Sequence, residues 1–347
     1  MNIFNKTVIQ SIFLLLFVAV YSKAQTINGK VFNEKSEALM GASVYIDGTT
    51  IGAISDQYGV FSFDIPADIN AILVCSFVGY ETFYLENPTP AQDYQIQLRP
   101  DLSILNEVIV FNNPFSRKEI MKTFKTVFIG ERKIQRKCII QNEDAIRFRY
   151  DRKLMTLEAF SQEPLLLKND HLGYTVSYDL NTFKVVFNSF TLSTDAIYSS
   201  VFAGTTRFKS SPIQKAFLEK RNKAYQNSTL EFFRALADNR LNEKGYQIYF
   251  DSYPVRASNY LHVLAQDGHS IVTVKKQNRA MKPKNYVGEL SILYKKNKQS
   301  KISFFTDSFI IDRYGVYSDF YKVLFTGALT EKKVGMMLPA DYIPSVN

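Results

Sequence analysis

The chain has 347 residues, with 42 Lys or Arg against 33 Asp or Glu and a formal net charge of +9. That length is enough for two domains with ordinary hydrophobic cores, even after removal of a leader. After residue 24 no segment is long and apolar enough to cross a membrane as a helix, which excludes a polytopic helical membrane protein.

The first 24 residues have the order of an export signal. Lys6 precedes the apolar run 12–20, and the small residues Ser22 and Ala24 close the segment. The apolar run is about half the ~20 residues that span a bilayer, so we expect cleavage rather than an anchor. No cysteine lies at the cleavage point, so no lipid anchor is expected. We predict a signal peptide at 1–24 and an exported protein, periplasmic or outer-membrane-associated.

Residues 25–100 have the pattern of a small β-sandwich. Short apolar runs alternate with turn residues about every ten positions. In the Asp-Gln-Tyr-Gly turn at 56–59 we expect the Asp56 carboxylate to accept backbone N–H groups and Gly59 to supply a permissive backbone. Phe61, Phe63 and Ile65 then alternate with polar residues, which marks one buried face of a strand.

Three segments of this region, at 39–44, 52–61 and 77–80, resemble the carboxypeptidase-like regulatory domain in the same order. The resemblance implies a transthyretin-like β-sandwich. It implies no activity, because that module is fused to many unrelated partners. Met40 and Ser55 depart from the Pro and Thr that are common at these positions.

Residues 101–130 are expected to connect two domains. The segment 102–110 resembles the one that follows this module in TonB-dependent receptors, where it can act as the energy-coupling box; a plain linking strand is the alternative. Residues 112–129 predict a helix, since Ile120 and Phe124 fall on one broad apolar face.

Residues 131–347 predict an α+β domain with mostly antiparallel strands, so the fold as a whole is expected to be mainly β. Strands are predicted, among others, at 174–180, 183–190, 197–202, 246–250 and 288–294. One helix is expected to open with Ser211 as N-cap and Pro212 at its first position. A second is expected to open with a capping box at 228–231.

This half resembles an exported family of Bacteroidota type that carries the same front module. The resemblance is carried by 128–131, 171–180, the helical signature from 217 to 234 and the stretch 338–344. Within the signature, Phe217, Asn227 and Glu231 replace the Trp, Gly and His usual in that family.

Three residues of that signature form the candidate ligand site: Arg221, Tyr225 and Arg234. Two guanidinium groups and a phenol near one helical corner could bind a carboxylate, phosphate or sugar. Alternatively, the arginines cap helix ends or pair with Glu219 and Glu231.

A basic surface is predicted on the later hairpins, at Lys275, Lys276, Arg279, Lys295 and Lys296. It could meet a phosphate-bearing envelope glycolipid, with an affinity that falls as salt rises. The alternative is that these bases only discourage aggregation between strand edges.

No motif predicts an enzyme. A zinc carboxypeptidase needs converging His and Glu ligands, yet none of the three histidines begins an H-x-x-E; His262 and His269 leave only a two-histidine site conceivable. We expect no metal and no cofactor. Cys75 and Cys138 are expected either to pair, as export permits, or to be separate thiols.

The sequence therefore predicts a non-enzymatic, exported cell-envelope protein that binds or scaffolds. Its partner would be an envelope glycan, a glycolipid or an outer-membrane protein, and not nucleic acid. Two alternatives stay open: an accessory to TonB-dependent uptake, and a glycan hydrolase with a carboxylate pair that only folding would bring together.

Overall fold

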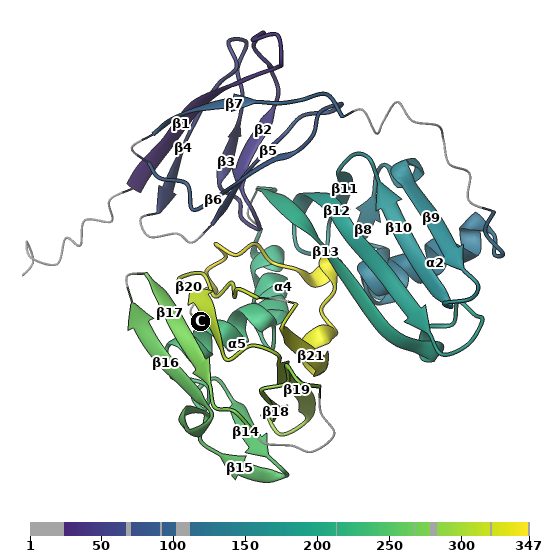
Figure 1. The fold of residues 1–347 in the computed structure, drawn as a ribbon, viewed down its shortest axis with the longest axis vertical. Helices are drawn as coiled ribbons and strands as arrows, with labels where there is room; N and C mark the ends of the chain where they lie inside the picture. The colour runs from purple at the N-terminus through teal and green to yellow at the C-terminus, as the bar shows by residue number, and fades with distance from the viewer. Residues whose placement is uncertain are drawn as a thin grey trace, which may run out of the picture.

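The computed structural model describes residues 24–66, 71–90, 92–101, 112–212, 214–266, 268–277, 283–319 and 321–345. The predicted signal peptide, apart from its last residue, lies outside the described residues, as does the receptor-like segment 102–110. Figure 1 shows a sandwich, a second sheet beside it and a third lobe below both.

The front of the chain is a two-sheet sandwich. One sheet has the order β4-β1-β7 and the other the order β3-β2-β5-β6. Only the pairing of β1 with β7 is parallel. The strands are β1 (Ala24–Phe32), β2 (Ser43–Ile46), β3 (Gly52–Ile54), β4 (Val60–Pro66), β5 (Ile72–Ser76), β6 (Phe83–Glu86) and β7 (Asp93–Gln97). The predicted sandwich is confirmed.

The turn into β4 forms as expected. Asp56 Oδ1 accepts hydrogen bonds from the backbone N–H groups of Tyr58 (2.8 Å) and Val60 (2.9 Å). Gly59 has a φ of +76°, and a Cβ there would lie 2.4 Å from the carbonyl oxygen of Val31. A left-handed backbone and this close approach together require glycine at this position.

The middle of the chain forms a sheet with the order β8-β11-β12-β10-β9, and β13 pairs with β12. Its strands are β8 (Cys138–Ile140), β9 (Ile146–Asp151), β10 (Thr156–Ser161), β11 (Leu165–Asn169), β12 (Tyr174–Phe187) and β13 (Ile197–Ser210). The strands expected at 174–180 and 183–190 are one strand. A register shift between Leu180 and Thr182 absorbs the break in the apolar pattern.

Helix α2 (Arg117–Phe128) covers one face of this sheet (Figure 1). Ser116 caps it, and Glu119 completes a capping box, so the helix begins later than its apolar pattern predicted. The ring of Phe124 stacks on that of Phe128, with 5.1 Å between ring centroids, and its centroid lies 4.7 Å from that of the Phe183 ring. A polar face of α2 is thereby left toward solvent.

Two helices lead into the third lobe, α4 (Lys215–Tyr225) and α5 (Thr229–Ala237). The expected start of α4 at Ser211 and Pro212 is wrong. The backbone N–H of Ser211 instead donates to the carbonyl of Gly173, which extends the sheet contacts past β13, and the N-cap is Gln214. Ser228 caps α5 as predicted, but Glu231 accepts from the backbone N–H of Asn227 rather than from Ser228.

The third lobe combines α5 with two antiparallel sheets, ordered β15-β14-β18-β19-β21 and β16-β17-β20. Their strands are β14 (Tyr246–Phe250), β15 (Tyr253–Val255), β16 (Leu261–Gln266), β17 (His269–Val274), β18 (Gly288–Tyr294), β19 (Lys298–Phe304), β20 (Ser308–Asp312) and β21 (Val323–Gly327). Its core is separate from that of the middle sheet. The predicted region 131–347 thus holds two hydrophobic clusters.

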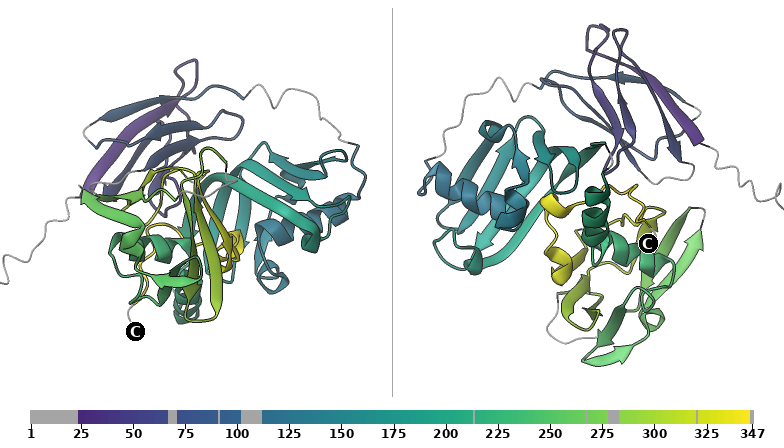
Figure 2. Two further views of the ribbon diagram at one scale, coloured as in Figure 1. Left: turned by 60° about the horizontal axis from the view of Figure 1, so that its bottom comes forward. Right: turned by 180° about the vertical axis from the view of Figure 1, so that it is seen from behind.

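The three parts meet at the loop between β2 and β3. The Gly48 N–H donates to the carbonyl of Thr206 at 2.8 Å, and the Phe208 N–H donates to the carbonyl of Thr49 at 3.0 Å. The Ala340 N–H donates to the carbonyl of Gly48 at 2.7 Å. Figure 2 shows the sandwich seated on the end of the long β12–β13 hairpin.

Cys75 and Cys138 are both buried and unpaired, so they are separate thiols. Burial raises the pKa of each thiol to about 12. Within the described ranges, no helix is both long and apolar enough to cross a membrane.

Candidate functional site

Arg221, the first predicted ligand residue, is buried at 4% exposure. Its Nε donates to the carbonyl of Leu172 at 2.7 Å and its Nη2 to that of Gly173 at 2.8 Å. The guanidinium lies 3.8 Å from the ring centre of Tyr174. Arg221 therefore ties α4 to the turn before β12.

Arg234 is likewise bonded to backbone carbonyls, but to a different set. Its three nitrogens donate to Tyr314, Tyr342 and Ala340 at 2.8, 2.8 and 2.7 Å. It also lies 5.4 Å from the ring centre of Tyr225. The structure thus brings Tyr225 and Arg234 together, whereas Arg221 serves another contact.

Neither expected ion pair, with Glu219 or Glu231, is among the contacts of these arginines in the described residues. Arg234 also borders an open hollow of about 430 Å³ with His269 and Asp312. Ligand binding by Arg221, Tyr225 and Arg234 stays a prediction. The two arginines already donate most of their hydrogen bonds to backbone carbonyls of the protein.

The predicted lysine hairpins are exposed at Lys275, Lys276, Lys295 and Lys296, whereas Arg279 lies outside the described residues. Lys295 and Lys296 form the turn between β18 and β19, with φ values of +44° and +63°. These lysines stand on turns and strand ends. Their role as a ligand surface stays a prediction.

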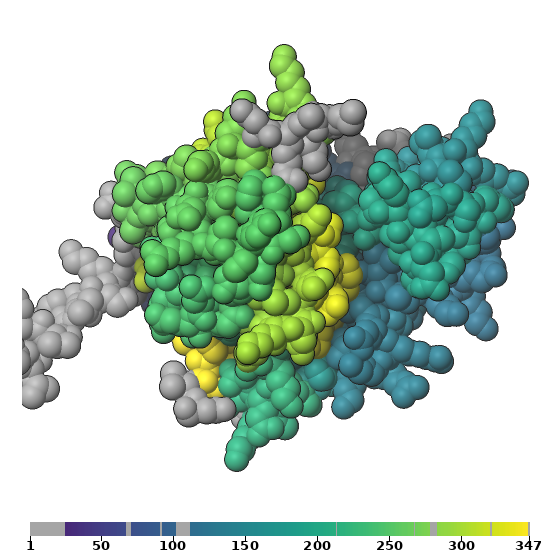
Figure 3. All heavy atoms as spheres, turned by 90° about the horizontal axis from the view of Figure 1, so that it is seen from below, coloured from purple at the N-terminus to yellow at the C-terminus, as the bar shows by residue number. Residues whose placement is uncertain are grey.

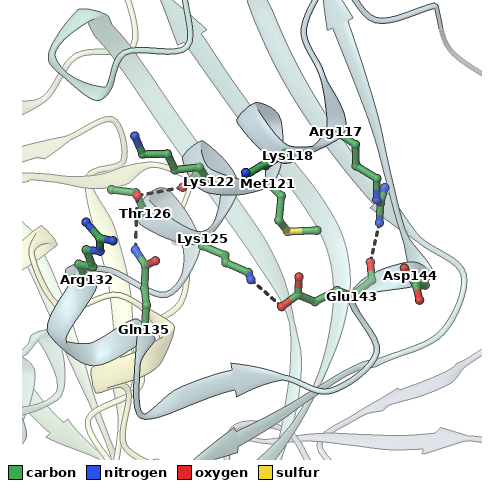
Figure 4. A pocket seen from close by; sticks show the side chains of 10 residues that line it. All are labelled: Arg117, Lys118, Met121, Lys122, Lys125, Thr126, Arg132, Gln135, Glu143 and Asp144. Atoms are coloured by element: carbon green, nitrogen blue, oxygen red, sulfur yellow. Dashed lines mark hydrogen bonds and ion pairs between the residues drawn. The ribbon is translucent and has the colours of Figure 1, made fainter.

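A larger hollow, of about 960 Å³, lies beside α2 and is called here the α2 groove. Five basic and two acidic side chains line it, and Met121 is its apolar member. The full lining is Arg117, Lys118, Met121, Lys122, Lys125, Thr126, Arg132, Gln135, Glu143 and Asp144 (Figure 4). These residues come from α2, the short helix α3 (Arg132–Gln135) and the turn before β9.

Two of the five bases are already engaged. Lys125 forms an ion pair of 2.6 Å with Glu143. Arg117 donates to the carbonyls of Ile146 and Glu143 at 3.0 and 2.8 Å. These contacts hold the turn before β9 against α2 and give the groove a defined wall.

The other three bases, Lys118, Lys122 and Arg132, are exposed. Within the part of the chain that the structure describes, none of them has an ion pair or a side-chain hydrogen bond. Three positive charges facing one hollow repel one another, and an anionic ligand would relieve that repulsion.

The sequence carried a signal for this groove that motif reasoning missed. Lys118, Lys122 and Lys125 are spaced i, i+4 and i+7, which places them on one face of the predicted helix. Arg132, the next base of the groove lining, follows seven residues after Lys125. The apolar face of the helix was recognised, but its basic face was not.

No group of three or more His, Cys, Asp or Glu that could hold a metal occurs among the described residues. His262 pairs with Thr273 and His269 with Gln266, so the two histidines stand at opposite ends of the β16–β17 hairpin.

The front module is similar in sequence to a known family of domains. Residues 27–110 match the family of the CarboxypepD_reg-like domain. The front sandwich is a carboxypeptidase-regulatory-like domain. This confirms the resemblance carried by the three segments at 39–80, and the match extends past residue 100 into the connector.

Among curated proteins, the TonB-dependent receptor SusC of Bacteroides thetaiotaomicron is 35% identical over 97 residues. Those residues make up 28% of this chain and 9% of the receptor, so the chain spans only a small part of the length of that relative. Together with the family match, this is consistent with a carboxypeptidase-regulatory-like protein of Bacteroidota type.

Solved structures with some likeness include a type II cohesin–X-dockerin complex from Acetivibrio cellulolyticus, at 16% identity and a TM-score of 0.20 over 31% of this chain and 79% of that one. A DUF3823 family protein from Bacteroides ovatus has 12% identity and a TM-score of 0.18 over 55% and 82%. TM-scores this low support no statement about fold or function.

Proposed function

We propose that this chain is an exported, envelope-associated binding protein that acts without catalysis and holds its ligand in the α2 groove. The observation that carries the proposal is the set of three exposed bases, Lys118, Lys122 and Arg132, around one hollow, none of which forms an ion pair within the described residues. The match to an outer-membrane receptor and the signal-like first 24 residues support the envelope location.

In this proposal the carboxypeptidase-regulatory-like module has a structural role: it fixes the position of the middle sheet. Its loop 47–50 is hydrogen-bonded to β13 and to Ala340 in the C-terminal segment. Figure 3 shows the C-terminal segment, in yellow, on the surface between the green and teal lobes. The module would then hold the sheet that carries α2 in a set orientation toward its partners.

The test is retention of an envelope component by the tagged full chain, measured at low and high salt. The groove variant is Lys118→Gln, Lys122→Gln, Arg132→Gln. A matched variant, Lys275→Gln, Lys276→Gln, Lys296→Gln, removes the same charge from the lysine hairpins. Loss of the retained component in the groove variant alone supports the proposal. Equal loss in both, or loss in the hairpin variant alone, overturns it.

A second function, accessory to TonB-dependent uptake, is favoured by the identity with SusC over 97 residues. It predicts that the protein co-purifies with a receptor and that deletion of 102–110 abolishes this. Unchanged co-purification after the deletion would contradict it. A hydrolase would need a carboxylate whose substitution abolishes turnover of a polysaccharide.

A further inference from the structure

We infer that the α2 groove recognises a phosphorylated sugar, with the phosphate at its Lys122–Arg132 end and the sugar toward Asp144. This inference rests on the proposed function and names the ligand class of the same site. Figure 4 shows the two ends: Lys122 and Arg132 lie at one side of the groove, Glu143 and Asp144 at the other, and Lys118 lies between them.

The unengaged bases favour a phosphate. A phosphate monoester carries nearly two charges and three strong acceptor oxygens. The Arg132 guanidinium can donate two parallel hydrogen bonds to such a group, and Lys118 and Lys122, one helical turn apart, can add point charges. A carboxylate offers one charge and two oxygens, so it would satisfy fewer of these donors.

The size and lining of the groove call for more than an isolated ion. Its volume of about 960 Å³ suits a ligand of many atoms. Met121 is the only apolar member of its lining among the described residues, so an acyl chain would gain little there. Among the polar side chains of the lining, Thr126 Oγ1 and Gln135 Nε2 already donate to the carbonyls of Lys122 and Gly130. The Gln135 side-chain oxygen can accept from a hydroxyl group next to the phosphate, which favours a body rich in hydroxyl groups.

The acidic end then gives the ligand an orientation. Glu143 is held by its ion pair with Lys125, and the exposed carboxylate of Asp144 can accept hydrogen bonds from sugar hydroxyls. The same carboxylate would repel a phosphate placed beside it. Arg117 and Lys125 are bonded to Glu143, so the unengaged bases still place the phosphate at the Lys122–Arg132 end.

The experiment measures binding of soluble probes to the purified full chain by calorimetry. The probes are glucose 6-phosphate, glucose, and inorganic phosphate. We expect glucose 6-phosphate to bind, and its affinity to fall at least about tenfold in Lys118→Gln, Lys122→Gln, Arg132→Gln. The matched variant Arg136→Gln, Lys137→Gln, Lys153→Gln removes the same charge from exposed positions outside the groove lining, and should change the affinity less than about twofold.

Further arms separate the alternatives. Asp144→Asn should lower the affinity for glucose 6-phosphate. The affinity for inorganic phosphate should stay the same or rise. Vesicles containing phosphatidic acid test whether the phosphate comes from a lipid. If the ligand is a glycolipid headgroup, the soluble sugar phosphate should bind as well. Binding to the vesicles but not to the sugar phosphate overturns the sugar assignment. Glucose that binds as well as its phosphate, inorganic phosphate that binds as well as the sugar phosphate, or equal loss in both triple variants also overturns the inference.

The two proposals fail separately. If envelope retention depends on the groove but none of the three soluble probes binds, the ligand class is wrong and the binding function stands. Circular dichroism of each variant checks that the fold is kept.

Discussion

The carboxylate of Asp47 accepts a hydrogen bond of 2.6 Å from the backbone N–H of Thr206, and this contact joins the front sandwich to β13. Asp47 lies in the same loop whose Gly48 and Thr49 bond to the sheet. The Asp47 side chain therefore provides the acceptor for the Thr206 N–H at the junction between the sandwich and the middle sheet.

Replacement of Asp47 by Ala should weaken this junction. The Thr206 N–H would lose its acceptor, and we expect the free energy of unfolding to fall by about 1–3 kcal/mol. Denaturant unfolding measures the loss, and amide exchange at Thr206 should quicken. Asp56→Ala, in the β4 turn of the same module, is the comparison: faster Thr206 exchange there as well would show that the effect is not local to the junction.

The junction should also make stability depend on pH. Burial raises the pKa of Asp47 to about 6, and burial does the same for Asp312. At these two groups the folded protein binds more protons than the unfolded chain between about pH 4 and 6, so the stability they contribute is present below this window and is lost as pH rises through it. A carboxyl pKa raised from its usual range to about 6 is worth at most about 3 kcal/mol per group.

We therefore expect the unfolding midpoint in denaturant to be higher at pH 5 than at pH 7. Asp47→Asn should reduce the difference, because it removes one of the carboxyl groups whose pKa burial raises. An unchanged difference in that variant would contradict the assignment to Asp47.

Arg221→Ala should destabilise the protein by about 1–3 kcal/mol, because the buried carbonyl of Leu172 would lose its Arg221 donor and that of Gly173 would keep the Ser211 N–H alone of the two. Arg221→Lys should restore only part of this, since an ammonium cannot reproduce the planar fork. Lys223→Ala, exposed on the same helix, should stay within about 0.5 kcal/mol of the parent. A stable Arg221→Ala protein would instead favour the predicted ligand role.

Asn227→Gly should stabilise the chain by about 1 kcal/mol. Asn227 has a φ of +53°, and both polar atoms of its side chain are buried without a hydrogen-bond partner in the described protein. Glycine removes those atoms and suits the backbone, which outweighs its larger entropy loss. Thermal unfolding tests this, with Asn239→Gly, exposed and also at positive φ, as the comparison. A lower melting temperature for Asn227→Gly would contradict the expectation.

Local patterns predicted much of the architecture. The alternation at 61–65 and the Asp56–Gly59 turn identified the sandwich, and the strands at 246–250 and 288–294 have the predicted bounds. Strands β8 and β16 were missed although most of their residues are apolar. β16 leaves most of its side chains exposed, and β8 has only three residues and forms by pairing with β11, a segment that a local pattern does not bring to it. The start of α4 was wrong for the same reason, since Ser211 bonds to Gly173.

The site was harder to predict than the fold. Arg221 and Arg234 look like ligand residues in sequence, yet their carbonyl partners at 172–173, 314 and 340–342 become neighbours only on folding. The α2 groove was readable in part, from the spacing of Lys118, Lys122 and Lys125. Its opposite wall, Glu143 and Asp144, required the tertiary structure.

The bonds made by residues 340–342 also set the order in which the molecule can be completed. Ala340 donates to Gly48, and the carbonyls of Ala340 and Tyr342 accept from Arg234. Residues 340–342 follow every strand of the three parts in the chain, so they leave the ribosome after all of these strands. The bonds of loop 47–49 to β13 can form before these residues emerge, but the bonds of residues 340–342 to Gly48 and Arg234 can form only afterwards, so the junction is completed last.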